Sequence, residues 1–480
     1  MSQVRTEGLG SRALRNTAVV LAARVLSRLL ALVTVLATLN HLGDAGFGRF
    51  QTLVNYTALV AVLVDLGFNT LYIREGARHP AQIERYLNNL LSVKALFSAV
   101  ALVVLAALLR LRNFQDLLLP GFVLMVLTSY SNLLRGTFYA LQRLGYEAIA
   151  IVLESLLLLG LVLAGIFTHQ GVAYFIWSYA ASYAFSCVYF LAVLLLNNLV
   201  RIRWRLEPAF VRRWFWSGLP FALTFVLTTL YFRIDVPILQ LFRSDAEVGW
   251  YSAAYKPFEA LLFLPMTMLQ VVFPVLSVYH KDSPDRVAAA TARFFKSLAM
   301  LGWPVTVGTY LLAPELTHVF RLFQQSEAAL RILSIGIVFM FVNNAFIAAL
   351  NSIDRQALFT WAALGSLVVN VILNGVLIPL YGYIGASYAT VLTEVALGVI
   401  CWVLVARELK PLPVLALSWR VLAAGAVMGV VVWLFRDFGG VGVLVPIAAG
   451  AAVYLPLVFL FRIIDREEMA IARRALRRGT

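Results

Sequence analysis

The sequence has few charged residues and few cysteines. Only 13% of its 480 residues are charged, 61% are hydrophobic, and the mean hydropathy is +0.85. A soluble domain cannot bury so large an apolar fraction. Apolar runs of about 20 residues, long enough to cross a bilayer, recur from one end of the chain to the other. The composition therefore predicts a polytopic membrane protein without a soluble domain.

Catalytic and metal-binding motifs are missing as well. Cys187 and Cys401 both lie within apolar runs, which argues against a disulfide framework and a cysteine metal site. The five histidines show no ligand spacing. No phosphate-binding loop, nucleophile elbow or zinc-binding histidine pair is present. We therefore expect no enzyme activity, no metal and no cofactor, apart from a proton or sodium ion that could couple transport.

The distribution of charge predicts the topology. Arginine and lysine gather in alternate loops, and the basic loops lie on the same side as the N-terminus, whose first 16 residues are typical of a cytoplasmic tail and not of a signal peptide. The net charge of +15 thus indicates that both termini are cytoplasmic, and it does not predict nucleic-acid binding. About fourteen transmembrane spans are predicted, at 17–40, 50–72, 87–109, 117–141, 147–168, 171–198, 217–242, 248–278, 294–314, 328–351, 356–379, 384–406, 414–435 and 441–462.

The loops on the opposite side are all short. An integral-membrane glycosyltransferase or polymerase that works on lipid-linked sugars outside the membrane needs a sizeable external loop or domain. The sequence offers neither, which disfavours this class.

Three pairs of matching segments indicate an internal repeat. "DAGFGRF" at 44–50 matches "DAEVGWY" at 245–251, "ALQRLGYEA" at 140–148 matches "ALNSIDRQA" at 349–357, and "GVAY" at 171–174 matches "GASY" at 385–388. Each block holds six spans, so the copies cross in the same direction, as in transporters with parallel repeats. The predicted domains are an N-terminal lobe (1–198), a basic cytoplasmic linker (199–216), a C-terminal lobe (217–410), and two further spans with a basic cytoplasmic tail (411–480).

Several stretches resemble a known family. They are "LGDAGFGRF", "VDLGF", "LRGTFYALQR", "YFRIDVPIL", "VGWYSAAYKPFE" and "VLIPLYGYIGASYAT". Across residues 10–410 the chain resembles the polysaccharide transporter family, the Wzx-type flippases for lipid-linked oligosaccharides, within the multidrug/oligosaccharidyl-lipid/polysaccharide exporter superfamily. The resemblance implies an all-α fold in which two six-helix lobes, followed by two C-terminal helices, surround a central cavity that opens alternately to each side.

Charged residues inside the predicted spans point to a polar pathway. Each costs about 2.5–3.5 kcal/mol at the centre of a lipid-facing helix, so together they must face a shared cavity or one another. Pairing is an open alternative for several: Asp65 with Arg74, Arg135 with Glu154, and Lys256 with Glu259. Arg24 could instead snorkel to the interface. Arg233 and Asp235 are two residues apart, so one is expected to face the cavity while the other bonds to the next span.

Basic residues outnumber acidic ones in this set, which also includes Lys94. A cationic cavity suits a diphosphate, because arginine forks match its oxygens, and it disfavours the cationic substrates of a multidrug exporter. Asn370 and Asn374 could bond sugar hydroxyls, although interhelical hydrogen bonds are the commoner role of such amides. The predicted substrate-binding residues are Arg24, Arg28, Arg135, Arg233, Lys256, Asn370 and Asn374, and the candidates for binding a coupling ion are Asp65, Glu154 and Asp235.

The function predicted from the resemblance and the charges is lipid flipping. The expected substrate is an undecaprenyl-diphosphate-linked oligosaccharide, the repeat unit of an O-antigen, capsule or exopolysaccharide, moved from the inner to the outer leaflet of a bacterial or archaeal inner membrane. The alternatives are an ion-coupled multidrug and toxin extrusion (MATE) exporter and a lipid II-type flippase. Expected partners are membrane lipids, a polysaccharide polymerase and glycosyltransferases.

Overall fold

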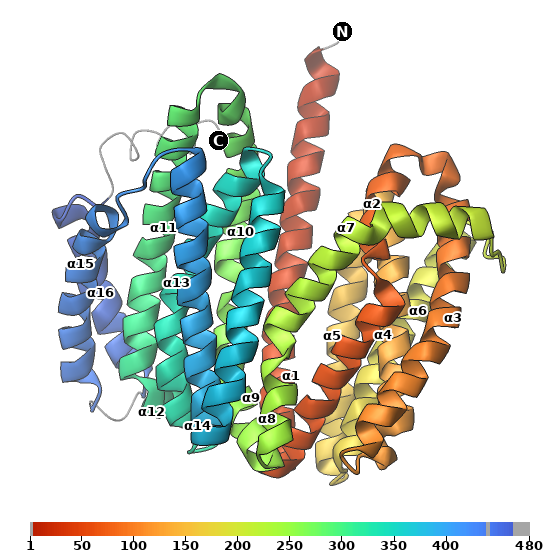
Figure 1. Ribbon diagram of the computed structural model, residues 1–480, viewed down its shortest axis with the longest axis horizontal. Coiled ribbons are helices and arrows are strands. Elements are labelled where there is room, and N and C mark those ends of the chain that lie inside the picture. Colours follow the sequence, from red (N-terminus) through yellow and green to blue (C-terminus); the bar gives the residue numbers. More distant parts are fainter. Residues whose placement is uncertain (1–2, 438–441, 464–480) are drawn as a thin grey trace. The chain divides into compact units, whose positions relative to one another are not determined.

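The chain folds as an all-helical protein. The computed structural model describes residues 3–437 and 442–463, and these residues form helices and connecting turns with no strand (Figure 1). The basic residues at the end of the predicted tail, from 464 onward, lie outside the described residues.

Ten helical segments in the described residues are long and apolar enough to cross a membrane. Two of them are bent pairs of helices. The first, α1 (Gln3–Asp65), bends at Gly43, and α14 (Gln356–Glu408) bends at Gly382, so each holds two of the predicted spans. Both glycines have positive φ, 69° and 60°, which side-chain-bearing residues rarely adopt. The prediction of an all-α polytopic fold is confirmed.

The chain divides into two compact units, residues 1–249 and 250–480. This division falls beyond the predicted linker because α7 and α8 pack with α1 and α2. The six-span lobes 1–198 and 217–410 stay a prediction. Unit 1 contains α1, α2 (Phe68–Arg78), α3 (Ile83–Arg110), α4 (Leu118–Ala140), α5 (Leu144–Phe167), α6 (Val172–Leu196), α7 (Pro208–Arg233), α8 (Asp235–Phe242) and the first turn of α9 (Asp245–Leu261).

Unit 2 begins within α9. Its α11 and α13 pack extensively on each other, as do α13 and α14, and α15 pairs with α16. A single apolar stretch, predicted as one span at 248–278, is broken at Leu262 between α9 and the next helix. The helices of unit 2 are α10 (Phe263–Asp282), α11 (Pro284–Leu311), α12 (Ala313–Val319), α13 (Ser326–Ser352), α14, α15 (Val414–Phe435) and α16 (Leu444–Leu460).

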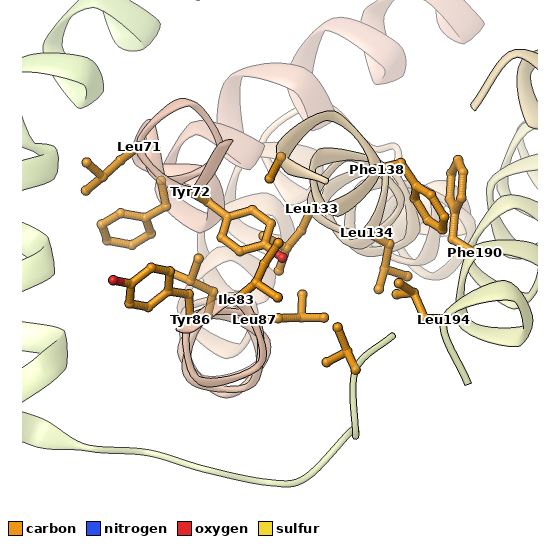
Figure 2. Packing of buried hydrophobic residues seen from close by; sticks show 14 of the residues in the cluster. Leu71, Tyr72, Ile83, Tyr86, Leu87, Leu133, Leu134, Phe138, Phe190 and Leu194 are labelled. Carbon is orange, nitrogen blue, oxygen red and sulfur yellow. The ribbon is translucent and has the colours of Figure 1, made fainter. Parts of the chain in front are cut away.

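The core of unit 1 joins six of its helices, α2 to α7. Figure 2 shows Leu71 and Tyr72 of α2 facing side chains of α3 and α4, while Phe138 of α4 meets Phe190 of α6. The rings of Phe138 and Phe190 are 5.1 Å apart, and the Tyr72 hydroxyl lies 2.8 Å from the hydroxyl of Thr137. Lipid tails are as apolar as these side chains, so close packing and interhelical hydrogen bonds hold the unit together.

Two of the predicted spans break where a charge stands. Asp65 ends α1, and Gly67, with φ 65°, starts α2. A Cβ on Gly67 would lie 2.5 Å from the backbone nitrogen of Ala222 in α7, so only glycine fits there. The span predicted at 217–242 breaks at Ile234.

The break at Ile234 explains the two charges beside it. Arg233 lies in the last turn of α7, and Asp235 lies in the first turn of α8. The partial charges of helix ends favour a cation at a C-terminus and an anion at an N-terminus. Both charges therefore stand where helix dipoles stabilise them.

The first repeated motif forms a helix start in each copy. The backbone N–H of Ala45 donates to the side chain of Asp44 at 2.7 Å, and Asp245 is the first residue of α9. The two starts lie against each other within unit 1. A Cβ on Gly48 would lie 1.7 Å from the Asp245 carbonyl oxygen, and one on Gly249 would lie 2.1 Å from that of Asp44. The glycine of each copy is thus required by the backbone of the other.

Candidate functional site

Polar side chains line up along four helices of unit 1. They recur at helical spacing on α1, α4 and α5, so each of these helices presents one polar stripe toward its neighbours, and α6 adds a single serine. We call this set the polar seam, and its members are Arg24, Ser27, Arg28, Arg135, Tyr139, Glu147, Glu154, Ser155 and Ser186.

At one end of the seam, Arg24 joins α1 to α4 and α5. Its guanidinium donates to the hydroxyl of Tyr139 at 2.6 Å, and Tyr139 donates to the carboxylate of Glu147 at 2.8 Å. The distance from Arg24 to Glu147 is 3.8 Å. One turn further, the hydroxyls of Ser27 and Ser155 lie 2.6 Å apart. Arg24 is half-exposed while Glu147 is buried, so Arg24 is the accessible member of the Arg24–Tyr139–Glu147 group.

Deeper in the spans, Arg135 pairs with Glu154. Its guanidinium lies 2.8 Å from the carboxylate, which also accepts a hydrogen bond from Ser186. The side chains of Arg135 and Glu154 are 20% and 17% exposed. The pairing considered from the sequence is therefore confirmed, and it ties α4, α5 and α6 together.

Arg28 differs from the other two arginines of the seam. Its side chain is exposed and forms no ion pair or hydrogen bond with any residue that the structure describes.

The break between α7 and α8 borders the second half of α1. Arg233 donates to the side-chain oxygen of Asn55 at 3.4 Å. Asp235 is buried, 6% exposed, at the start of α8. In the following turn, Gln240 accepts a hydrogen bond from Thr52 and donates one to Asp245. Polar contacts therefore continue from α1 across α8 to the start of α9.

Asp65 has a partner other than the one considered from the sequence. It pairs with Lys94 of α3, and both groups also bond to Ser129 of α4. Arg74 pairs instead with its neighbour Glu75 at 3.0 Å. The predicted place of Lys94 among cavity-lining bases is also corrected, because its side chain is fully buried. Lys94 is buried and Arg74 is exposed, and an unpaired charge costs more in the buried position. This explains why Asp65 pairs with Lys94.

The remaining predicted residues belong to unit 2. Lys256 pairs with Glu259 one turn away at 2.9 Å, as considered from the sequence. Asn370 and Asn374 are both buried within α14. Asn370 donates to Thr393 at 3.3 Å, and Asn374 donates to the side chain of Asn370 at 3.1 Å. Asn370 therefore joins the two halves of the bent helix, and Asn374 holds the side chain of Asn370, a structural role that is the commoner one for such groups.

Sequence reasoning missed five of the nine members of the seam: Ser27, Tyr139, Glu147, Ser155 and Ser186. Tyr139, Glu147 and Ser186 satisfy charges that were singled out, while Ser27 and Ser155 bond to each other. One signal was available: Glu147 and Glu154 are seven residues apart, hence on one face of a helix over two turns. Among the described residues, no group of three or more histidine, cysteine, aspartate or glutamate side chains could hold a metal ion.

Comparison with solved structures identifies proteins that share this fold. Among solved structures, the chain is similar to the lipid II flippase MurJ in its inward closed conformation, with a TM-score of 0.73 and 14% identity over 92% of this chain and 98% of that one. It is also similar to an inward-facing multidrug resistance MATE family transporter, with a TM-score of 0.63 and 16% identity over 82% of this chain and 96% of that one. The fold is thus shared with these two membrane proteins.

Sequence comparison gives the family. The family model described as "Polysaccharide biosynthesis protein" matches residues 13–280, more than half of the chain, so the chain belongs to that family. A second model, "Lipid II flippase MurJ", matches residues 251–450. The predicted family resemblance is confirmed.

Two curated relatives come from Haloferax volcanii. "Probable flippase AglR" is 26% identical over 234 residues, covering 47% of this chain and 49% of the relative. "Probable low-salt glycan biosynthesis flippase Agl15" is 24% identical over 166 residues, covering 34% of this chain and 35% of the relative. The chain therefore spans half or less of the length of these relatives.

Proposed function

We propose that this protein is a flippase that moves a lipid-linked oligosaccharide across a membrane by alternating access. Membership of the polysaccharide biosynthesis protein family supports this function, as do the fold shared with MurJ and MATE transporters and relatives named as flippases. It is a transporter rather than an enzyme, and its partners are membrane lipids and the lipid-linked glycan. A polymerase and glycosyltransferases would act on the same glycan.

The observation that carries the proposal is the position of Arg28. The seam contains three arginines and two glutamates, and Arg28 is the arginine without a carboxylate within the described residues. A lone guanidinium in an apolar helix is costly unless water or an anion meets it. A diphosphate is a suitable anion, because its oxygens accept two parallel bonds from one guanidinium. The glycan is polar and the lipid tail can stay in the bilayer.

The charge of the seam bears on the alternatives. A cationic drug would be repelled by Arg28, which disfavours a MATE-type exporter. A lipid II-type flippase carries the same diphosphate chemistry, so the seam fits both lipid-linked substrates. The transported glycan distinguishes them.

Energy coupling is a further part of the proposal. Asp65 and Glu154 are ion-paired to Lys94 and Arg135, so a proton or sodium ion that bound either carboxylate would release a cation within the spans. Asp235 is the third candidate. An inside-negative potential would also drive a diphosphate outward, by about 2.3 kcal/mol per charge per 100 mV.

Transport by the purified chain in proteoliposomes tests the function. The assay follows the fraction of an undecaprenyl-diphosphate-linked oligosaccharide that becomes accessible to an external periodate or lectin reagent. Arg28→Ala should lower the flipping rate about 10- to 100-fold, the effect of one charge-assisted hydrogen bond, and Arg28→Lys should restore part of it. The control is Arg143→Ala, which removes an exposed arginine at the α4–α5 turn and should leave the rate unchanged.

Two results would contradict the proposal. An unchanged rate in Arg28→Ala would remove the seam from substrate binding. Transport of an organic cation, with no movement of the lipid-linked glycan, would favour the exporter.

A further inference from the structure

The segment before α7 is not helical, yet it is held in place along its length. Residues 199–207, which we call the strap, connect α6 to α7. Val200 is 3% exposed and lies in the core of unit 1, and Trp214 in the first turns of α7 is buried in the same core. Both ends of the strap are therefore anchored.

Buried polar side chains of α3 hold the middle of the strap. Asn88 donates to the carbonyl of Arg201 at 2.8 Å and accepts from the backbone N–H of Arg203 at 3.0 Å. The backbone N–H of Arg205 donates to Ser92 at 3.3 Å, and that of Glu207 donates to Asn89 at 2.8 Å. The side chains on α3 are 0–2% exposed. They satisfy the backbone of the strap, which fixes its register.

The register of the strap determines which of its side chains share a face. Alternate N–H groups, those of residues 201, 203, 205 and 207, face α3, which is the period of an extended chain. Successive side chains of an extended chain point to opposite faces. Arginines at 201, 203 and 205 thus share one face, and the apolar residues Ile202, Trp204 and Leu206 share the other.

Both faces of the strap are open. Trp204 is 76% exposed, Leu206 46% and Ile202 37%. The guanidinium groups of Arg201 and Arg203 form no ion pair or hydrogen bond with the described residues, while that of Arg205 pairs with Glu207. Exposed arginines next to an exposed tryptophan are typical of the membrane–water interface, where the ring sits among headgroups and the cations meet phosphates.

The position of the strap on α3 is consistent with this environment. Its contacts run from Glu84 to Ser92, and α3 belongs to a helical segment, Pro80–Arg110, that is apolar enough to span a membrane. Eight residues of helix rise about 12 Å, so the strap lies beside the first turns of a spanning helix. The topology predicted from the sequence puts this end of α3 in the cytoplasmic leaflet, which is rich in anionic lipid.

We infer that the strap is an anionic-lipid site: Arg201, Arg203 and Arg205 bind the phosphates of phospholipid headgroups while Ile202, Trp204 and Leu206 enter the interface. The lipid is part of the surrounding membrane and not the transported substrate. The site does not depend on the proposed function, since it concerns how unit 1 is anchored.

Depth measurements in nanodiscs test the site. Cys187 and Cys401 are buried, so Trp204→Cys adds an exposed thiol that can be labelled with an environment-sensitive dye. Quenching of the dye by doxyl-labelled lipid should increase as phosphatidylglycerol replaces phosphatidylcholine, and salt should reverse the increase. In the background of Arg201→Gln, Arg203→Gln and Arg205→Gln, the preference for phosphatidylglycerol should fall about 100-fold, from three lost charges.

A matched triple variant controls for net charge. Arg78→Gln, Arg143→Gln and Arg407→Gln remove three exposed arginines elsewhere in the chain and should keep the lipid dependence. Native mass spectrometry of the chain with Trp204 intact should show fewer bound phosphatidylglycerol molecules only for the strap variant. The inference is overturned if quenching is the same in both lipids, if the strap variant keeps its preference, or if the dye stays in water throughout, which would leave the strap for a protein partner.

Discussion

The polar seam of unit 1 and the amide contacts of α14 in unit 2 both place polar groups inside apolar helices, but in different ways. In the seam, Arg24 and Arg135 pair with glutamates, and Arg28 is exposed and has no carboxylate in the described residues. In α14, Asn370 and Asn374 are buried and bond within the helix and across its bend.

The difference indicates which polar groups serve packing. An amide that is buried and bonded by its neighbours has little capacity left for a ligand, and its removal costs hydrogen bonds. Arg28, which is exposed and has no ion pair among the described residues, is dispensable for packing, because its substitution removes a cost of insertion. We therefore propose a functional role for Arg28 of the seam and a packing role for the amides, a comparison that four substitutions can test.

The largest effect is expected at Lys94, where a charge is buried as deeply as the amides. Lys94→Ala leaves Asp65 without its cation, which should lower the free energy of unfolding by about 3–5 kcal/mol. Thermal unfolding of the purified chain in nanodiscs measures this loss. The double variant Lys94→Leu with Asp65→Leu should recover most of the stability.

Arg28→Ala is the matched control for Lys94, because Arg28 has no ion pair to lose among the described residues. Its midpoint of unfolding should stay at the wild-type value. A loss of stability in Arg28→Ala as large as that in Lys94→Ala would mean that the seam arginines are structural, and the comparison would fail.

A smaller effect is expected at Asn370. Asn370→Ala removes the bond to Thr393 and the contact with Asn374, and each interhelical bond is worth about 0.6–1 kcal/mol. Stability should fall by about 1–2 kcal/mol, while the flipping rate per folded molecule should stay unchanged. A variant that is stable yet inactive would instead assign Asn370 to sugar binding, as the sequence allowed.

The sequence predicted where the helices lie better than it predicted which polar groups meet. Apolar runs are a local signal, and the runs near Gly43 and Gly382 were separated correctly by their glycines and charges. Pairing is not local. Arg135 and Glu154 were matched because few candidates stood on adjacent spans, whereas the partner of Asp65 depends on how α3 packs against α1. The helix predicted from residue 217 begins earlier, at Pro208, a residue favoured in a first helical turn.

The smallest effect on stability is expected at Glu207. Its ion pair with Arg85 lies outside the spans and is exposed to water, so it serves as a reference for the ion pairs inside the spans. Glu207 accepts hydrogen bonds from the guanidinium of Arg85, which lowers the pKa of its carboxyl below the ordinary value of 4.5. A carboxylate with a lowered pKa contributes stability that is fully present above its ordinary pKa and is lost as pH falls through the lowered one.

The midpoint of unfolding should therefore differ slightly between wild type and Glu207→Gln from neutral pH down to about pH 4.5, and the difference should vanish at lower pH. Added salt should reduce it as well, because exposed ion pairs are screened. The same salt should leave the Lys94→Ala loss almost unchanged, since that pair is shielded from water. If salt reduced both losses equally, the pair of Asp65 and Lys94 would be solvated, and it would belong with the half-exposed charges of the seam.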